Sequence, residues 1–156
     1  MKPNQLAAVL VFAVLGTSAL AQVVVKDPWV RATVDHQKTT GAFMQIQSTR
    51  DTRLIEVRSP AARMVEVHEM SMDNNIMRMR VTPGINLAAG ELLELKPAGN
   101  HLMLMDLTGQ IRPGDTVPIT LVFEGKDGKR ETMDVKVPVR ALNTSAKPAA
   151  HGDHKH

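Results

Sequence analysis

The sequence of 156 residues contains no cysteine. A chain without cysteine forms no disulfide and offers no thiolate, either as a nucleophile or as a metal ligand. It also lacks the N-terminal cysteine through which lipoproteins are anchored. A protein of this composition has to be stabilised by its hydrophobic core alone, and any metal that it binds has to be held by other side chains.

Aromatic residues are also scarce, at 3% of the chain, and the formal net charge is only +3. Nucleic-acid-binding surfaces usually combine a basic stripe with stacking aromatic side chains, and this sequence has neither because its charges are interspersed. No serine–histidine–carboxylate arrangement, pair of carboxylates or glycine-rich phosphate loop stands out. The sequence therefore predicts a protein that is not an enzyme and does not bind nucleic acid.

No apolar run is long enough for a membrane-spanning helix, which needs about 20 residues. The apolar run at residues 6–16 follows a short, positively charged start and precedes small residues that end at Ala21. This order is typical of a secretory signal peptide, so we predict that residues 1–21 are removed by cleavage after Ala21. The alternative is an N-terminal membrane anchor. The mature protein is expected outside the cytoplasm, without stable membrane insertion.

The rest of the chain alternates apolar and polar residues in short runs, which are separated by turn residues. Nine strands are predicted, at residues 29–34, 42–47, 53–58, 64–70, 76–81, 92–96, 101–107, 116–124 and 131–139. Short strands at this spacing indicate an all-β antiparallel sandwich or barrel, which we expect to occupy residues 22–140. The alternation ends after Arg140, so residues 141–156 are predicted to form a disordered tail.

Against these absences, the sequence has ten methionines and six histidines. Seven of the methionines lie between residues 64 and 105, together with two of the histidines. In the stretch HLMLM at residues 101–105, the alternation of a strand places His101, Met103 and Met105 on one face. Leu102 and Leu104 share the other face and are expected to pack in the core.

The stretch DNN at residues 73–75 predicts a tight hairpin between two methionine-containing strands. A turn centred between residues 73 and 74 places His68 opposite Met79, whereas a turn at residues 74 and 75 places Met70 opposite Met79 and shifts His68 by one pair. In either register, His68 lies within one or two cross-strand neighbours of Met79. Because Arg78 and Arg80 share one face of the second strand, its methionines are expected to face inward or toward a pocket.

His68, Met79, His101 and Met103 together offer two imidazoles and two thioethers, all without charge. A thioether is a soft ligand that prefers Cu(I) to hard ions such as Mg²⁺ or Ca²⁺, and zinc rarely takes methionine. A neutral ligand set favours Cu(I) over Cu(II), and a blue-copper electron-transfer site would need a cysteine thiolate. The residues alone leave two interpretations open, a soft-metal site or ordinary packing of methionine and histidine.

The spacing of these four residues resembles the H(M)-x10-M-x21-H-x-M signature of the PCu(A)C family of periplasmic copper chaperones. His68, Met79, His101 and Met103 match it without a gap or a substitution. The flanking stretches are similar to that family as well, namely DPWVRATV, TGAFMQI, VEVHEMSMDNNIMRMR and LKPAGNHLMLMDL. The resemblance extends from about residue 24 to residue 139.

The resemblance implies a cupredoxin-like Greek-key β-barrel or sandwich and a periplasmic carrier of Cu(I), with His68, Met79, His101 and Met103 as ligands. It also implies delivery for assembly of the CuA site of cytochrome c oxidase, with the copper-site subunit of that oxidase and a Sco-like protein as partners. Transfer by ligand exchange requires His101 and Met103 to lie near the surface. Copper storage or tolerance without delivery is the alternative function, and a non-metal interaction module with a methionine patch is a third.

Several further methionines and histidines lie outside the signature. Four methionines are interpreted as packing, with a path for arriving copper as the alternative: Met70, Met72, Met77 and Met105. Three histidines form a cluster in the predicted tail: His151, His154 and His156. Imidazoles on a flexible chain suit Cu(II), Ni(II) or Zn(II), so the tail is either an auxiliary metal site or a solvated polar end. His36, beside Asp35, is expected at the surface.

Overall fold

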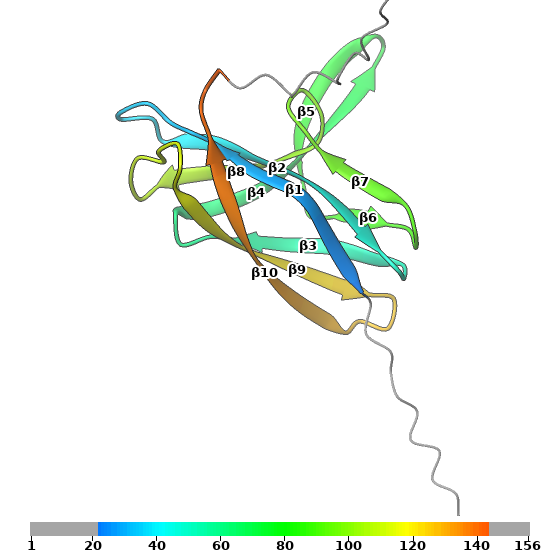
Figure 1. Cartoon of the computed structure of the whole chain (residues 1–156). Coiled ribbons are helices and arrows are strands. Elements are labelled where there is room, and N and C mark those ends of the chain that lie inside the picture. Colours follow the sequence, from blue (N-terminus) through cyan, green and yellow to red (C-terminus); the bar gives the residue numbers. More distant parts are fainter. Residues whose placement is uncertain (1–21, 144–156) are drawn as a thin grey trace, which may run out of the picture.

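The computed structural model describes residues 22–143, which form ten strands and no helix (Figure 1). No helix in these residues could therefore cross a membrane. The strands are β1 (Val23–Arg31), β2 (Thr39–Ser48), β3 (Thr52–Arg58), β4 (Ala62–Asp73), β5 (Ile76–Thr82), β6 (Ile85–Leu87), β7 (Leu92–Leu95), β8 (His101–Leu107), β9 (Thr116–Gly125) and β10 (Arg130–Arg140). The predicted signal peptide at residues 1–21 and the tail from residue 144 lie outside the described residues.

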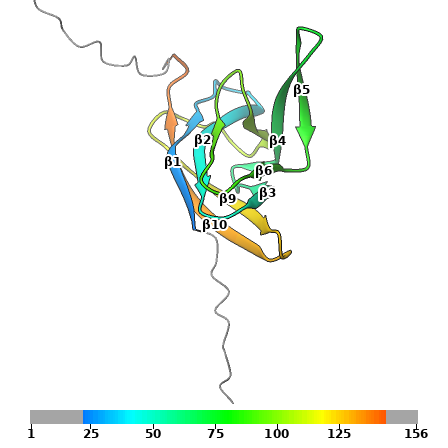
Figure 2. The same ribbon diagram turned by 90° about the vertical axis from the view of Figure 1, so that its right-hand side faces the viewer.

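The strands hydrogen-bond in the order β5-β4-β8-β2-β1-β10-β9-β3-β6, and β7 pairs with the second half of β2. The only parallel pairing in this described order joins β1 to β10, through Val30 with Val139 and Arg31 with Arg140. This short junction separates one layer, from β5 to β1, from a second layer, from β10 to β6. Figures 1 and 2 show the two layers facing each other. The predicted all-β architecture is confirmed.

The core lies between the two layers and is entirely apolar at its centre. Ile46, Leu102 and Leu104 contribute from the first layer, and Leu54 and Leu121 contribute from the second. Each of these side chains is fully buried, and such burial stabilises the fold by about 1.5–3 kcal/mol per side chain. Leu102 and Leu104 therefore occupy the core positions that strand alternation predicts for them.

Two features of the strand pattern differ from the sequence-based prediction. Strand β1 begins at Val23 rather than Trp29, because Asp27 and Pro28 lie at a bulge where the register with β2 shifts. Asp27 has a φ of 46°, and a bulge tolerates proline because its residues need not donate to the ladder. Strand β6 was not predicted, since three residues at a sheet edge are too few to show alternation.

The β4–β5 hairpin projects beyond the body of the sandwich (Figure 2), and β5 is exposed from Ile76 to Val81. Asn74 and Asn75 form its turn with φ values of 49° and 64°. Two consecutive positive φ values are typical of a type I′ turn, whose backbone twist matches the right-handed twist of the two strands that it joins. Met70 consequently lies opposite Met79, and the second of the two predicted registers is confirmed.

Candidate metal site

Three neighbouring strands bring the predicted ligands onto one surface. Strand β4 lies between β5 and β8, and His68 of β4 is directly opposite His101 of β8. Met79 of β5 is opposite Met70, which shares a face with His68, and Met103 shares a face with His101. All four predicted ligands therefore lie on the outer face of the first layer, away from the core.

The His68 ring lies between the side chains of Met79 and His101. Its Nδ1 atom is 3.0 Å from the sulfur of Met79, and its centroid is 5.3 Å from that of the His101 ring. Met103, which is half-buried, lies opposite Glu66 of β4 and Gly41 of β2 in the ladders on either side of β8. The structure thus gathers two imidazoles and a thioether in contact, with a second thioether at the adjacent register position.

The hydrogen bond of His101 determines which of its ring nitrogens faces the site. Nδ1 lies 2.8 Å from the carbonyl oxygen of Gly99. Because a carbonyl oxygen only accepts, Nδ1 of the neutral ring carries the proton and Nε2 keeps the lone pair that can bind a metal. A backbone carbonyl on the non-ligating nitrogen is a common way to orient a metal-binding histidine.

The turn that supplies this carbonyl is a strained one. The Gly99 N–H donates to the carbonyl of Lys96 at 3.0 Å, and Ala98 has a φ of 61°. A type II turn usually has glycine at that position, and alanine in the left-handed region costs about 1–2 kcal/mol. Asn100 accepts a 3.0 Å hydrogen bond from the Met70 N–H, which ties the turn to β4. The loop before β8 is thus held in place against the candidate site.

Glu66 is a site residue that sequence reasoning missed. Its Oε2 atom is 2.8 Å from Nε2 of His68, and both side chains are mostly buried, at 23% exposed for Glu66 and 12% for His68. A carboxylate accepts this bond, so Nε2 of the neutral ring is protonated and Nδ1 keeps its lone pair toward the sulfur of Met79. The signal was available in the sequence, because Glu66 precedes His68 by two residues and so shares its face of the strand.

Two aromatic side chains close the site on the side of β2. The Phe43 ring centroid is 6.3 Å from that of His101 and 4.4 Å from that of Trp29. The Phe43 ring also lies over Gly41, where an added Cβ would be only 2.6 Å from the ring. This aromatic wall limits the access of water to His101, and the guanidinium of Arg31 lies over both of its rings.

Access to the four residues is uneven. His101 is only 7% exposed, whereas Met79 is 51% exposed. The surface access that ligand exchange requires is therefore absent at His101, whose ring packs against those of Phe43 and His68, and partial at Met103. The site is instead open on the side of β5, where the protruding hairpin presents the thioether of Met79 to solvent.

The interpretation of the other methionines as packing residues is wrong for Met72 and Met77. Met72 and Met77, near the tip of the hairpin, are 66% and 50% exposed, while Met70 and Met105 are partly buried. The methionines of β5 do not face inward, because the hairpin extends past the core and both of its faces meet solvent. Met79 instead lines an open surface pocket together with Met72, as the second part of the expectation predicted. Strand alternation identifies the face of a side chain but not what covers that face.

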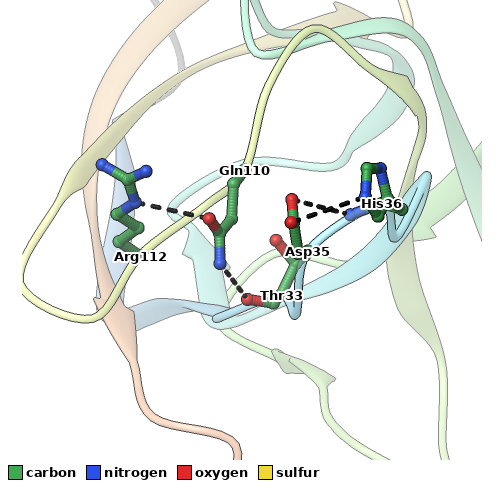
Figure 3. A network of polar contacts seen from close by, with 5 residues as sticks. All are labelled: Thr33, Asp35, His36, Gln110 and Arg112. Atoms are coloured by element: carbon green, nitrogen blue, oxygen red, sulfur yellow. Dashed lines mark hydrogen bonds and ion pairs between the residues drawn. The ribbon is translucent and has the colours of Figure 1, made fainter.

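The remaining histidines are separate from this surface. His36 is confirmed at the surface, where its ring nitrogen is 3.5 Å from the carboxylate of Asp35. Figure 3 shows this pair beside Gln110, which donates to the carbonyl of Thr33 and accepts from Arg112. The tail histidines His151, His154 and His156 lie outside the described residues. Within residues 22–143, no three histidine, aspartate or glutamate side chains are grouped so that they could hold a metal.

Solved structures similar to this chain share its architecture. The apo PCuAC domain of PmoF2 is 24% identical with a TM-score of 0.61, and the alignment covers 78% of this chain and 92% of that domain. The copper(I) form of DR1885 from Deinococcus radiodurans is 27% identical with a TM-score of 0.59, over 85% of this chain and 87% of that protein. These similarities confirm the predicted cupredoxin-like β fold.

The sequence profile of the family described as "Putative lipoprotein LpqE-like" matches residues 23–139. The chain is a PCuAC-type member of the LpqE-like family. One curated relative of this PCuAC-type protein is "Putative lipoprotein Lxx21020" from Leifsonia xyli subsp. xyli. The two are 34% identical over 119 residues, which cover 74% of this chain and 68% of the relative. The family resemblance predicted from the sequence is thereby confirmed.

Proposed function

We propose that this PCuAC-type protein binds one Cu(I) ion with His68, Met79, His101 and Met103 and carries it in the periplasm to the copper sites of respiratory oxidases. The contact between Nδ1 of His68 and the sulfur of Met79, with the His101 ring alongside, is the observation that carries the proposal. The copper(I) form of the similar protein DR1885 supports the choice of metal.

The donor chemistry favours a soft monovalent cation. His68 and His101 each use one ring nitrogen in a hydrogen bond to an acceptor, which leaves one lone pair on each ring for the metal. The two thioethers are soft and neutral, and Cu(I) accepts such ligands readily. The carboxylate of Glu66 supplies one negative charge next to His68, which offsets the single positive charge of the ion.

Transfer to a partner requires that one ligand leave without release of the ion into solution. Met79 is the ligand that suits this role, since it lies on the exposed strand of the hairpin while His101 is covered. A ligand of the partner replaces the Met79 sulfur first, and the buried imidazole holds the ion until further partner ligands have bound. The copper-site subunit of cytochrome c oxidase is the proposed recipient. A Sco-like protein is the proposed second partner in assembly of the copper site.

Anaerobic titration of the exported form with Cu(I), in competition with a chromophoric Cu(I) chelator, tests the site. The wild-type protein should bind one equivalent with high affinity, and His101→Ala should lose it. His36→Ala is the matched control, because His36 is an exposed histidine away from the site. A wild-type protein that fails to compete with the chelator would overturn the proposal.

Delivery is distinguished from storage in a strain that lacks the protein. Delivery predicts a loss of oxidase activity that added copper restores. Storage or tolerance, the alternative function, predicts normal oxidase activity together with sensitivity to copper. Complementation with His101→Ala, compared with His36→Ala, shows whether either phenotype depends on the metal site.

A further inference from the structure

The outer face of the β4–β5 hairpin carries a row of four thioethers, of which the proposed four-ligand site uses only that of Met79. Met72 is directly opposite Met77, and the next pair on the same face is Met70 with Met79. The following pair contains His68. We call these four methionines the methionine ladder; it runs from the tip of the hairpin to the candidate metal site.

Packing does not account for the outer end of the methionine ladder. Met72 and Met77 are 66% and 50% exposed, so the burial of their side chains contributes little to the stability of the fold. Methionine is not among the residues favoured in strands, which are β-branched and aromatic. A polar or β-branched residue at either position would serve the hairpin equally well. The property that the two side chains share is an accessible sulfur atom.

The register allows the two sulfurs of one pair to reach the same ion. Directly opposite residues of an antiparallel pair have Cβ atoms about 4.5–5.5 Å apart, and methionine has three rotatable bonds beyond its backbone. The two arginines of β5, Arg78 and Arg80, alternate with Met77 and Met79 and so face the other side of the strand. Met72 and Met79 nevertheless line an open pocket together with Arg78 and Arg80, and Arg78 forms an ion pair with Asp73. The thioethers are thus the soft ligands on a hairpin tip that also carries charged side chains.

We propose that Met72 and Met77 form a second, weaker site for Cu(I) at the hairpin tip, from which the ion passes along Met70 and Met79 to His68. This proposal rests on the proposed Cu(I) site, which it supplies. The transfer is an exchange of neutral ligands: each step forms one copper–sulfur or copper–nitrogen bond as another breaks, with no change in oxidation state and no proton released. Because a pair of thioethers lacks imidazole, it holds the ion less tightly than the four-ligand site.

The test compares Met72→Leu/Met77→Leu with wild-type protein and with Met64→Leu/Met105→Leu. The control pair is also a cross-strand methionine pair on the outer face, with Met64 similarly exposed, but it lies away from the hairpin. Leucine approximately preserves the volume and the apolar character of methionine and has no sulfur. The protein is labelled with ¹³C at the methionine methyl groups and titrated anaerobically with Cu(I), and its loading rate from a Cu(I)–chelate complex is measured.

In wild-type protein, the second equivalent of Cu(I) should shift the methyl resonances of Met72 and Met77. In Met72→Leu/Met77→Leu, the affinity for the first equivalent should be unchanged, whereas the loading rate should fall several-fold. The control variant should load at the wild-type rate. An unchanged loading rate in Met72→Leu/Met77→Leu would overturn the proposal and indicate that the tip is an apolar docking patch. An equal loss of rate in the control variant would also overturn it and indicate a nonspecific effect.

The two proposals fail in different ways. If the four-ligand site does not exist, wild-type protein binds no tight first equivalent and His101→Ala changes nothing. If only the ladder site is wrong, the first equivalent binds and is lost in His101→Ala, but the Met72 and Met77 resonances do not move and the rate is unaffected by their replacement.

Discussion

Glu66 and His68 lie two residues apart on the same face of β4, and a carboxylate oxygen of Glu66 is 2.8 Å from Nε2 of the His68 ring. This contact fixes the tautomer of His68 and directs Nδ1 toward Met79. The equivalent task at His101 is performed by the carbonyl of Gly99 on the opposite ring nitrogen. The two histidines are thus oriented by different partners and keep different ring nitrogens available for a metal.

Replacement of Glu66 should weaken Cu(I) binding without unfolding the protein. Loss of a partner that orients a metal-binding histidine typically costs about 10- to 100-fold in affinity. Glu66→Ala should show this loss in the chelator competition, and Glu66→Gln should recover part of it because its amide oxygen still accepts the bond. Glu69→Ala is the matched control, since Glu69 faces Arg80 on the other side of β4. Equal affinities of Glu66→Ala and Glu69→Ala would contradict the assignment.

The exposed and covered ligands should differ in their kinetic effects. Met79→Leu removes the proposed ligand that solvent reaches, so transfer of Cu(I) to an acceptor chelator should depend less on the acceptor concentration than in wild-type protein. His101→Ala removes the proposed ligand that is covered and should abolish tight binding. Stopped-flow transfer measured at several acceptor concentrations checks this order. The inference of ordered exchange fails if Met79→Leu transfers with wild-type kinetics.

The two faces of the layer should differ in their importance for stability. Leu104 is fully buried, so Leu104→Ala should lower the free energy of unfolding by about 2–5 kcal/mol. Met64, on the outer face of the neighbouring strand β4, is half-exposed, and Met64→Ala should cost about 1 kcal/mol or less. Urea denaturation followed by circular dichroism measures both changes. Similar losses in the two variants would show that the outer face is covered in solution.

A methyl group at Gly41 should disturb the aromatic wall of the site. Its Cβ would be 2.6 Å from the Phe43 ring, so the ring has to move. Overpacking of this kind costs about 1–3 kcal/mol of stability, and the displaced ring should also lower the affinity for Cu(I). Gly109→Ala is the control, because a Cβ there meets no atom within 4 Å. Gly41→Ala with the stability and affinity of Gly109→Ala would refute the prediction.

Much of the fold could be predicted from the sequence, because the alternation of apolar and polar residues identifies the two faces of each strand directly. The buried Leu102 and Leu104 and the turn-rich segments between strands followed from the pattern. The start of β1 did not, because Pro28 argues against a strand unless a bulge is known to be present. The hairpin register also stayed open, since DNN suits two turn positions, and only the positive φ values of Asn74 and Asn75 decide between them.

The candidate site was predictable to the extent that ligand spacing encodes it. The spacing identified His68, Met79, His101 and Met103, which the folded chain brings onto one surface. It did not identify Glu66, whose role depends on a contact within the strand rather than on a ligand position. The spacing also gave no information on solvent exposure. Neither the burial of His101 nor the exposure of Met72 at the hairpin tip could therefore be predicted.

The aromatic wall has a practical consequence for experiments on this protein. Trp29 is the sole tryptophan of the sequence, and its ring is in contact with Phe43, which in turn lies beside His101. If His101 binds Cu(I) as proposed, a shift of its ring should be passed through Phe43 to the indole. The fluorescence emission of the unlabelled protein should report the occupancy of the site, so that loading and transfer can be followed in real time without an added dye.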